Sequence, residues 1–351
     1  MNVDLPAGMR NYSYAQDMAV FRTRTHWALF VALLAAVFAA PFYLSNYWLG
    51  VANLIGITII AATGLNILTG YCGQLSIGHA GFIAVGAYTS AVLTNRSGVP
   101  FPAALVLSGV VAGSIGMVFG IPSLRVKGFY LAISTIAAQL IIVWVINHWT
   151  VVTGGFNGMS VPPSSIGSLV LVSQGSQFYL IMGVTAFTVF LAKNLARTRV
   201  GRAFVAIRDN DLAAEVMGIN LFHYKLVAFF VGCFLAGVAG SLFAHWTGFV
   251  NAENFTFMDS ILYVGMIIIG GLGTAVGPIF GAVFIRLLQQ AITFVSPLLE
   301  STFALPAGFT TGIGPMVFGL VIVLFLILEP RGLAHRWGLF KASYRLWPFS
   351  Y

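Results

Sequence analysis

The charged side chains that could do chemistry gather in one short segment of this chain. Residues 199–220, RVGRAFVAIRDNDLAAEVMGIN, combine cations and anions with apolar residues in a sequence of which only 7% is charged. Phe204 and Ile207 lie at helical spacing. Asn210 and its acidic neighbours can cap a second helix, and Gly218 can end it. The pattern favours a helix, a turn and a short helix that dock on a protein partner, or else a solvated loop between two spans.

The docking residues of this segment, taken as about 195–222, are Gly201, Arg202, Arg208, Asp209, Asp211, Ala213, Ala214, Glu215 and Gly218. No phosphate-cradling loop, metalloprotease helix or nucleophile elbow occurs anywhere in the sequence. Cys72 and Cys233 are far apart in apolar surroundings, which favours neither a disulfide framework nor a metal site. We therefore expect no enzyme and no cofactor bound by this chain.

The composition shows what must position this segment. Apolar residues make up 59% of the 351, whereas an ordinary soluble domain carries about 25% charged residues. No acidic residue, lysine or arginine lies between Arg24 and Arg96, or between Lys127 and Lys193. Each gap is long enough for about three crossings of roughly 20 residues. The chain is therefore predicted to be an all-α, polytopic integral membrane protein.

Hydropathy predicts ten membrane-spanning helices. Their approximate bounds are 27–45, 49–68, 77–94, 101–121, 128–148, 177–194, 224–246, 258–272, 277–298 and 309–328. With both termini in the cytoplasm, 15 of the 17 lysines and arginines fall on the inner side, as expected for a multi-pass membrane protein. The net charge of +8 thus reflects orientation in the bilayer, and we expect no nucleic-acid partner.

The predicted organisation has three parts. A cytoplasmic leader, 1–26, precedes the transmembrane domain, 27–328, and a basic cytoplasmic tail, 329–351, follows it. Arg96 and Arg286 depart from the charge bias. Arg286 falls inside an apolar stretch, where it either extends to a helix end or faces a water-filled pathway.

Two glycine-rich blocks, at 70–86 and 265–281, lie about 200 residues apart and resemble each other, which is consistent with a diverged internal repeat. Glycines of this kind either let helices pack closely or open a helix along a polar cavity. Polar residues interleave with the first block and could face a pathway. The candidates for pathway or packing roles are Gln74, Ser76, His79, Gly81, Gly270, Gly271, Gly273 and Gly277.

Four stretches, in order along the chain, resemble one permease family. They are GLNILTGYCGQLSIGHAGFIAVGAY at 64–88, PSLRVKGFYLAIST at 122–135, GRAFVAIRDNDLAAEVMGIN at 201–220 and GGLGTAVGPIFGA at 270–282. The family takes up branched-chain amino acids, and the chain is similar to its LivM-type rather than its LivH-type member. DLAAEVMG at 211–218 also looks like the EAA---G loop of ABC importer permeases, with the acidic residue shifted by one position.

The resemblance implies a permease subunit that forms half of the translocation pathway of an ATP-driven importer in a bacterial inner membrane. The implied partners are a second, LivH-like permease, two cytoplasmic ATPase subunits that bind ATP and Mg²⁺, and a periplasmic substrate-binding protein. Segment 201–218 would couple the chain to an ATPase subunit. Branched-chain or other hydrophobic amino acids are the implied substrates, with urea or short-chain amides as alternatives. An ion-coupled secondary transporter is the rival class, but almost every acidic residue between Trp27 and Ile327 falls in a predicted loop.

Overall fold

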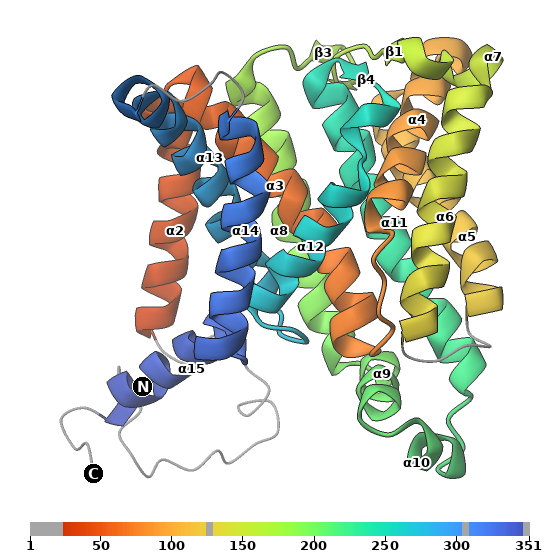
Figure 1. The fold of residues 1–351 in the computed structure, drawn as a ribbon, viewed down its shortest axis with the longest axis vertical. Coiled ribbons are helices and arrows are strands. Elements are labelled where there is room, and N and C mark those ends of the chain that lie inside the picture. Colours follow the sequence, from red (N-terminus) through yellow and green to blue (C-terminus); the bar gives the residue numbers. More distant parts are fainter. Residues whose placement is uncertain (1–23, 124–128, 304–308, 347–351) are drawn as a thin grey trace.

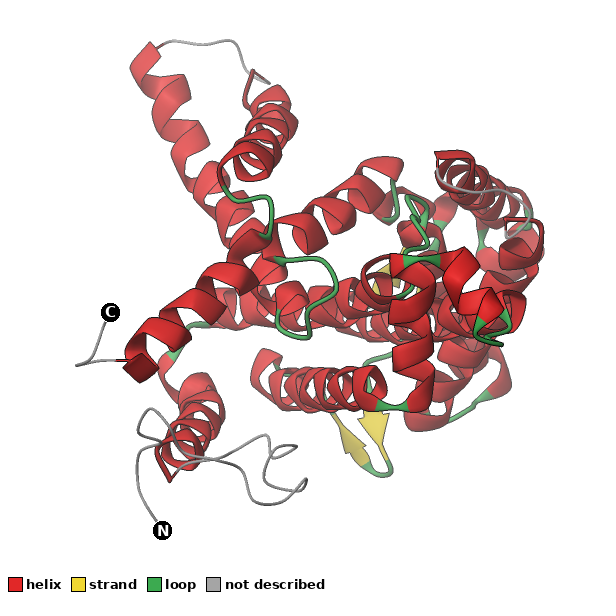
Figure 2. Cartoon of the chain, turned by 90° about the horizontal axis from the view of Figure 1, so that it is seen from below, coloured by secondary structure: helices red, strands yellow, loops and turns green. Residues whose placement is uncertain are grey.

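The computed structural model describes residues 24–123, 129–303 and 309–346, and helix dominates them (Figures 1 and 2). The α-helices are α2 (Arg24–Tyr43), α3 (Asn46–Leu65), α4 (His79–Ser97), α5 (Phe101–Ser123), α6 (Phe129–His148), α7 (Thr150–Thr153), α8 (Gln174–Arg197), α9 (Arg199–Asp209), α10 (Asp211–Val216), α11 (Leu221–Thr247), α12 (Phe257–Gly270), α13 (Gly277–Phe303), α14 (Phe309–Leu328) and α15 (Gly332–Leu346). A π-helical turn, η1 (Asn66–Tyr71), continues α3, and two 3-10 turns are η2 (Gly155–Asn157) and η3 (Ala252–Asn254).

Four two-residue strands complete the described elements. They are β1 (Met159–Ser160), β2 (Ser165–Ile166), β3 (Leu169–Val170) and β4 (Phe249–Val250). β1 pairs antiparallel with β4, and β2 with β3. These pairs lie at the same end of the helical assembly as α7 (Figure 1).

The prediction of an all-α, polytopic membrane protein is confirmed at that level. Each of the ten predicted spans overlaps a helix, from α2 to α14. Within the described residues, seven helices are long and apolar enough to cross a membrane, or eight if the bent pair α14 and α15 is one span. The number ten, the cytoplasmic location of the termini and the internal repeat stay predictions. Residues 1–23 of the predicted leader and the last five residues of the tail lie outside the described part.

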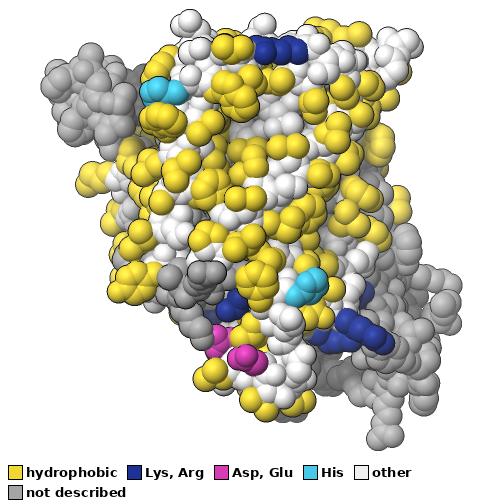
Figure 3. Space-filling model, turned by 90° about the vertical axis from the view of Figure 1, so that its right-hand side faces the viewer, with side chains coloured by type: hydrophobic (Ala, Val, Ile, Leu, Met, Phe, Trp, Pro, Cys, Tyr) yellow, Lys and Arg dark blue, Asp and Glu magenta, His cyan; other side chains and the backbone are white. Residues whose placement is uncertain are grey.

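The elements expected on opposite sides of a membrane lie at opposite ends of the structure. α9, α10 and α15 lie at one end, whereas α7 and the strands lie at the other (Figure 1). At the latter end, the Arg96 guanidinium donates a hydrogen bond to the Val151 carbonyl. The face in Figure 3 is apolar along most of its height, with charged side chains near the two ends. This arrangement matches a chain surrounded by lipid.

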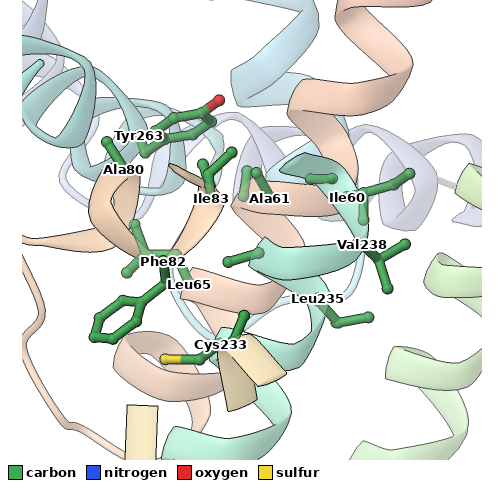
Figure 4. Close-up of a cluster of buried hydrophobic side chains, with 14 of the residues drawn as sticks. Ile60, Ala61, Leu65, Ala80, Phe82, Ile83, Cys233, Leu235, Val238 and Tyr263 are labelled. Carbon is green, nitrogen blue, oxygen red and sulfur yellow. The ribbon is translucent and has the colours of Figure 1, made fainter. Parts of the chain in front are cut away.

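α11 lies at the centre of the packing, against α3, α4 and α5. Apolar burial drives association only weakly inside a bilayer, so helices there gain stability from close backbone approach at small residues. A Cβ atom at Gly240 would overlap the carbonyl oxygen of Ile83 on α4, and one at Gly86 would overlap the Gly237 backbone. Around these crossings lies a cluster of buried apolar side chains from α3, α4, α11 and α12 (Figure 4).

Gly240→Ala tests this packing. We expect it to lower the free energy of unfolding by about 1–3 kcal/mol, because the added methyl group forces α11 away from α4. Gly183→Ala is the matched control, since a Cβ atom at Gly183 on α8 meets nothing within 4 Å. The measurement is the thermal unfolding midpoint of each full-length protein in detergent. Equal midpoints for the two variants would contradict the packing argument.

Candidate functional site

α9 is an amphipathic helix that lies under the membrane-spanning helices. The Thr198 side chain caps it by accepting a hydrogen bond from the Gly201 N–H at 3.2 Å. Gly201 is buried against the Leu195–Ala196 backbone of α8, where a Cβ atom would overlap the Leu195 carbonyl. Phe204 is fully buried and meets Tyr224 of α11 edge to face. α9 is thereby held against both α8 and α11.

α10 is short and closed at both ends. Asn210 caps it, because its Oδ1 accepts a hydrogen bond from the Ala213 N–H at 3.1 Å. At the other end Gly218 has a φ of +84°, and its N–H donates to the Glu215 carbonyl at 2.9 Å. The Ile219 N–H donates to the Ala214 carbonyl at 3.0 Å, which completes a Schellman ending. The predicted helix, turn and short helix are confirmed.

Ionic contacts brace the α9–α10 segment, by which we mean residues 199–218. Asp211 lies 4.0 Å from the ammonium group of Lys225 on α11. Arg208 pairs with Asp209 at 2.9 Å, while the exposed Arg202 donates to the Arg197 carbonyl at 3.1 Å. Asp211 and Arg202 thus fix the segment to the rest of the chain, whereas the Arg208–Asp209 pair lies within it.

Arg208 connects this segment to the membrane-embedded part. Its Nη1 donates a hydrogen bond to the Gly70 carbonyl in η1 at 3.0 Å. Its backbone and Cβ lie against Gly73, which has a φ of +73°, and its guanidinium lies against Gly273 in the α12–α13 connection. One side chain therefore contacts both glycine-rich blocks.

Asn66 joins the same two blocks directly. Its Nδ2 donates to the Thr274 carbonyl at 2.9 Å, and its Oδ1 accepts from the Gly273 N–H at 2.9 Å. η1 and the α12–α13 connection both depart from α-helical hydrogen bonding, so each exposes backbone groups that need other partners where water is excluded. We call η1, which begins at Asn66, and the α12–α13 connection, residues 271–276, the glycine junction. The sequence analysis identified the two blocks but did not single out Asn66. Its position one helical turn before Gly70 was the feature that could have indicated its role.

The candidate pathway residues lie in the interior. Ser76 and His79 are fully buried and Gln74 nearly so, and His79 Nε2 is 2.9 Å from the Ala61 carbonyl. A Cβ atom at Gly81 would press on Gln139 of α6. A Cβ atom at Gly270 would overlap the Gly277 carbonyl at the start of α13, and one at Gly277 would overlap the Gly271 carbonyl. Gly271 has a φ of +115°. Whether any of these residues contacts a transported solute stays a prediction.

A cavity of about 220 Å³ lies at one edge of the apolar cluster. Its walls come from α3, α4, α11, η3, α12 and α13, and Arg286 and Asp259 supply its charges. Arg286 lines this cavity: Nε donates to Thr58 Oγ1 and Nη1 to Gln289 Oε1, each at 2.9 Å. Which of its two alternatives holds stays a prediction. Sequence analysis did not single out Asp259, because it stands at the very start of the predicted span 258–272, where an acid is ordinarily solvated.

In the described residues, no group of three or more histidines, cysteines or acids could hold a metal ion. Cys72 and Cys233 are free and buried.

Sequence similarity links this chain to known permeases. Residues 47–327 match the family described as the permease component of the branched-chain amino acid transport system. The high-affinity branched-chain amino acid transport system permease protein LivM of Escherichia coli (strain K12) is 31% identical over 86% of this chain and 73% of its own length. A probable LivM of Methanocaldococcus jannaschii is 25% identical over 66% of this chain and 67% of its own.

The autoinducer 2 import system permease protein LsrC of Enterobacter sp. (strain 638) is 27% identical over 87% of this chain and 84% of its own length. Among solved structures, PsaBC from Streptococcus pneumoniae in complex with Fab has a TM-score of 0.41 and 14% identity. It covers 85% of this chain and 97% of that one.

Arg208→Ala tests the contact between the α9–α10 segment and the glycine junction. Loss of a charge-assisted hydrogen bond leaves the Gly70 carbonyl without this donor, so amide hydrogen exchange in η1 is expected to rise about tenfold. Arg199→Ala, at an exposed arginine in the first turn of α9, is the control and should leave that exchange unchanged. Equal exchange in η1 for both variants would show that Arg208 does not stabilise it.

Proposed function

Because this chain belongs to the family of branched-chain amino acid transport permeases and is a permease subunit of an ABC importer, we propose a specific assembly for it. It pairs with a second, LivH-like permease in a bacterial inner membrane, and each of two cytoplasmic ATPase subunits binds beneath the pair. A periplasmic binding protein delivers branched-chain or other hydrophobic amino acids. ATP and Mg²⁺ bind in the ATPase subunits, and this chain binds no cofactor.

The exposed apolar face of α10 is the observation that carries this proposal. Leu212 and Val216 on α10 and Met217 at its C-cap are 66%, 87% and 82% exposed, and α10 projects from one end of the structure (Figure 1). Exposed apolar residues grouped beside charges are typical of a protein interaction site. Their position next to Asp211 and Glu215 suits a cleft on an ATPase subunit that offers apolar walls and a basic rim.

The contacts around α9 support a route for force. A helix closed by Asn210 and Gly218 moves as a rigid unit, and α9 directly precedes it in the chain. Movement of α9 reaches the glycine junction through Arg208. Closure of the ATPase pair would thus shift η1 and the α12–α13 connection together. The α9–α10 segment would move as a rigid body and displace the ends of the helices that these two segments interrupt.

The co-purified complex tests the proposal. We expect the chain to co-purify with its ATPase subunits, and uptake of leucine into vesicles to stop when ATP hydrolysis is blocked. Uphill uptake by the purified chain alone, driven by a proton or sodium gradient, would instead identify a secondary transporter. Uptake of urea or a short amide in place of leucine would keep the architecture and change the substrate.

Val216→Asp tests the docking face of α10. A buried carboxylate in the ATPase cleft without a partner costs several kcal/mol, so co-purification of the ATPase subunit should fall by about tenfold or more. Leu339→Asp is the matched control, because Leu339 is an exposed apolar residue on α15 at the same end of the structure. The readout is the ATPase-to-permease ratio after affinity purification. An unchanged ratio for Val216→Asp would remove α10 as the docking element.

Asp211→Arg tests the brace between α10 and α11. The new cation would repel Lys225, so we expect transport to fall several-fold while the chain still inserts and purifies normally. Lys225→Asp in the same protein restores an opposite-charge pair and should recover part of the lost uptake. The measurement is leucine uptake per ATP hydrolysed. If the double variant is no better than Asp211→Arg, the pair does not transmit force.

A further inference from the structure

The cavity at Arg286 has two charges of opposite sign in a part of the protein that is nearly free of charge. Arg286 lies on α13 and Asp259 in the first turn of α12, and both line the cavity. In the part of the chain that the structure describes, neither forms an ion pair with any residue. Charges at membrane depth are costly and mark solute pathways when they line a cavity.

Neutral groups hold Arg286 in place. The Thr58 hydroxyl donates to the Leu54 carbonyl at 2.7 Å, so its oxygen is left to accept from Arg286 Nε. Gln289 Oε1 accepts from Nη1 at 2.9 Å. A guanidinium has five N–H donors, so donors remain for a carboxylate.

Asp259 is held in a similar way. Its Oδ2 accepts hydrogen bonds from the Thr256 N–H at 2.9 Å and from the Thr256 hydroxyl at 2.6 Å, in a capping box at the start of α12. Both bonds use Oδ2. Among the described residues, Oδ1 has no hydrogen bond and can accept one from an ammonium group.

Most of the remaining cavity wall is apolar and sets the size of a solute, while Asn254 and Tyr263 add two neutral polar groups. Its apolar lining is Leu54, Ile57, Ala80, Ile83, Phe243 and Phe255. Ala80, Ile83 and Tyr263 lie together at one edge of the apolar cluster, with the Tyr263 hydroxyl pointing away from it (Figure 4). A cavity of roughly 150 Å³ holds benzene, so in proportion about 220 Å³ holds about nine non-hydrogen atoms. Leucine and isoleucine have nine and valine has eight.

The geometry points to a binding station for one zwitterionic aliphatic amino acid within this chain. Arg286 binds the α-carboxylate, Asp259 binds the α-ammonium group, and the apolar wall surrounds a branched side chain. The inference rests on the proposed function and deepens it, because it assigns the permease itself a share in choosing the substrate.

Substitution of the two charges is the first test, made in vesicles that contain the whole complex and its binding protein. We expect Arg286→Gln and Asp259→Asn each to raise the KM for leucine uptake by about tenfold or more, because each leaves one substrate charge unpaired. Arg96→Gln, which removes the other outward arginine, should leave the KM unchanged. Wild-type KM in both cavity variants would overturn the inference.

Thiol protection is the second test and leaves both charges intact. Ile83→Cys replaces a cavity residue by a smaller one, and labelling by a small methanethiosulfonate reagent reports access to the cavity. The two native thiols are buried and do not line it. Leucine and valine should slow labelling of the whole complex. Leucinamide, which lacks the carboxylate, and 4-methylpentanoate, which lacks the ammonium group, should not. Equal protection by all four, or by none, overturns the inference.

These outcomes separate the station from the proposed function. If the wild-type complex shows no ATP-driven leucine uptake, the proposed function fails. If ATP-driven uptake is normal and thiol protection does not discriminate the four compounds, the station alone fails. If Arg286→Gln prevents assembly, Arg286→Lys, which keeps the charge, and the protection result decide the question.

Discussion

Helices interrupted inside a membrane must find partners for the backbone groups that the interruption exposes, because lipid supplies none. This constraint governs the glycine junction. η1 departs from α-helical pairing, and the connection between α12 and α13 leaves the helix altogether. Asn66 meets two of the exposed groups with one side-chain amide, and Arg208 donates to a third, the Gly70 carbonyl. These donors and acceptors stabilise both interruptions.

The same constraint explains why a peripheral segment can act on the centre of the molecule. A straight span would satisfy its own backbone and need nothing from α9. Because η1 accepts a hydrogen bond from Arg208, the α9–α10 segment is part of the structure that keeps the interruption stable. Gly73 and Gly273 leave room for the arginine, and any side chain there would press against it. Gly73 and Gly273 therefore allow Arg208 to approach the glycine junction closely, and this approach couples the α9–α10 segment to the junction.

Local signals could be predicted from the sequence, and long-range pairings could not. Asn210 and Gly218 cap α10 through bonds that reach at most five residues, so their spacing contained the information. The Asn66–Gly273 pairing joins residues 207 positions apart and depends on how α3 and α12 pack. Hydropathy likewise shows that Arg286 is a charge in an apolar stretch, but it cannot show that Thr58 on α3 accepts a hydrogen bond from it. The sequence therefore left two alternatives for the position of Arg286.

A station inside a transporter must bind its solute and also release it, so strong binding would slow transport. The cavity meets both needs because the groups that would bind the solute also have hydrogen-bond partners within the chain. Arg286 keeps its neutral partners Thr58 and Gln289, and Asp259 keeps Thr256, when no solute is bound. The charges are thereby stabilised in the empty state, which limits what a solute gains on entry. Because α12 and α13 carry these charges and end or begin at the glycine junction, a shift of that junction would change the separation of Arg286 and Asp259. Release of the solute and movement of the α9–α10 segment are then two consequences of one displacement.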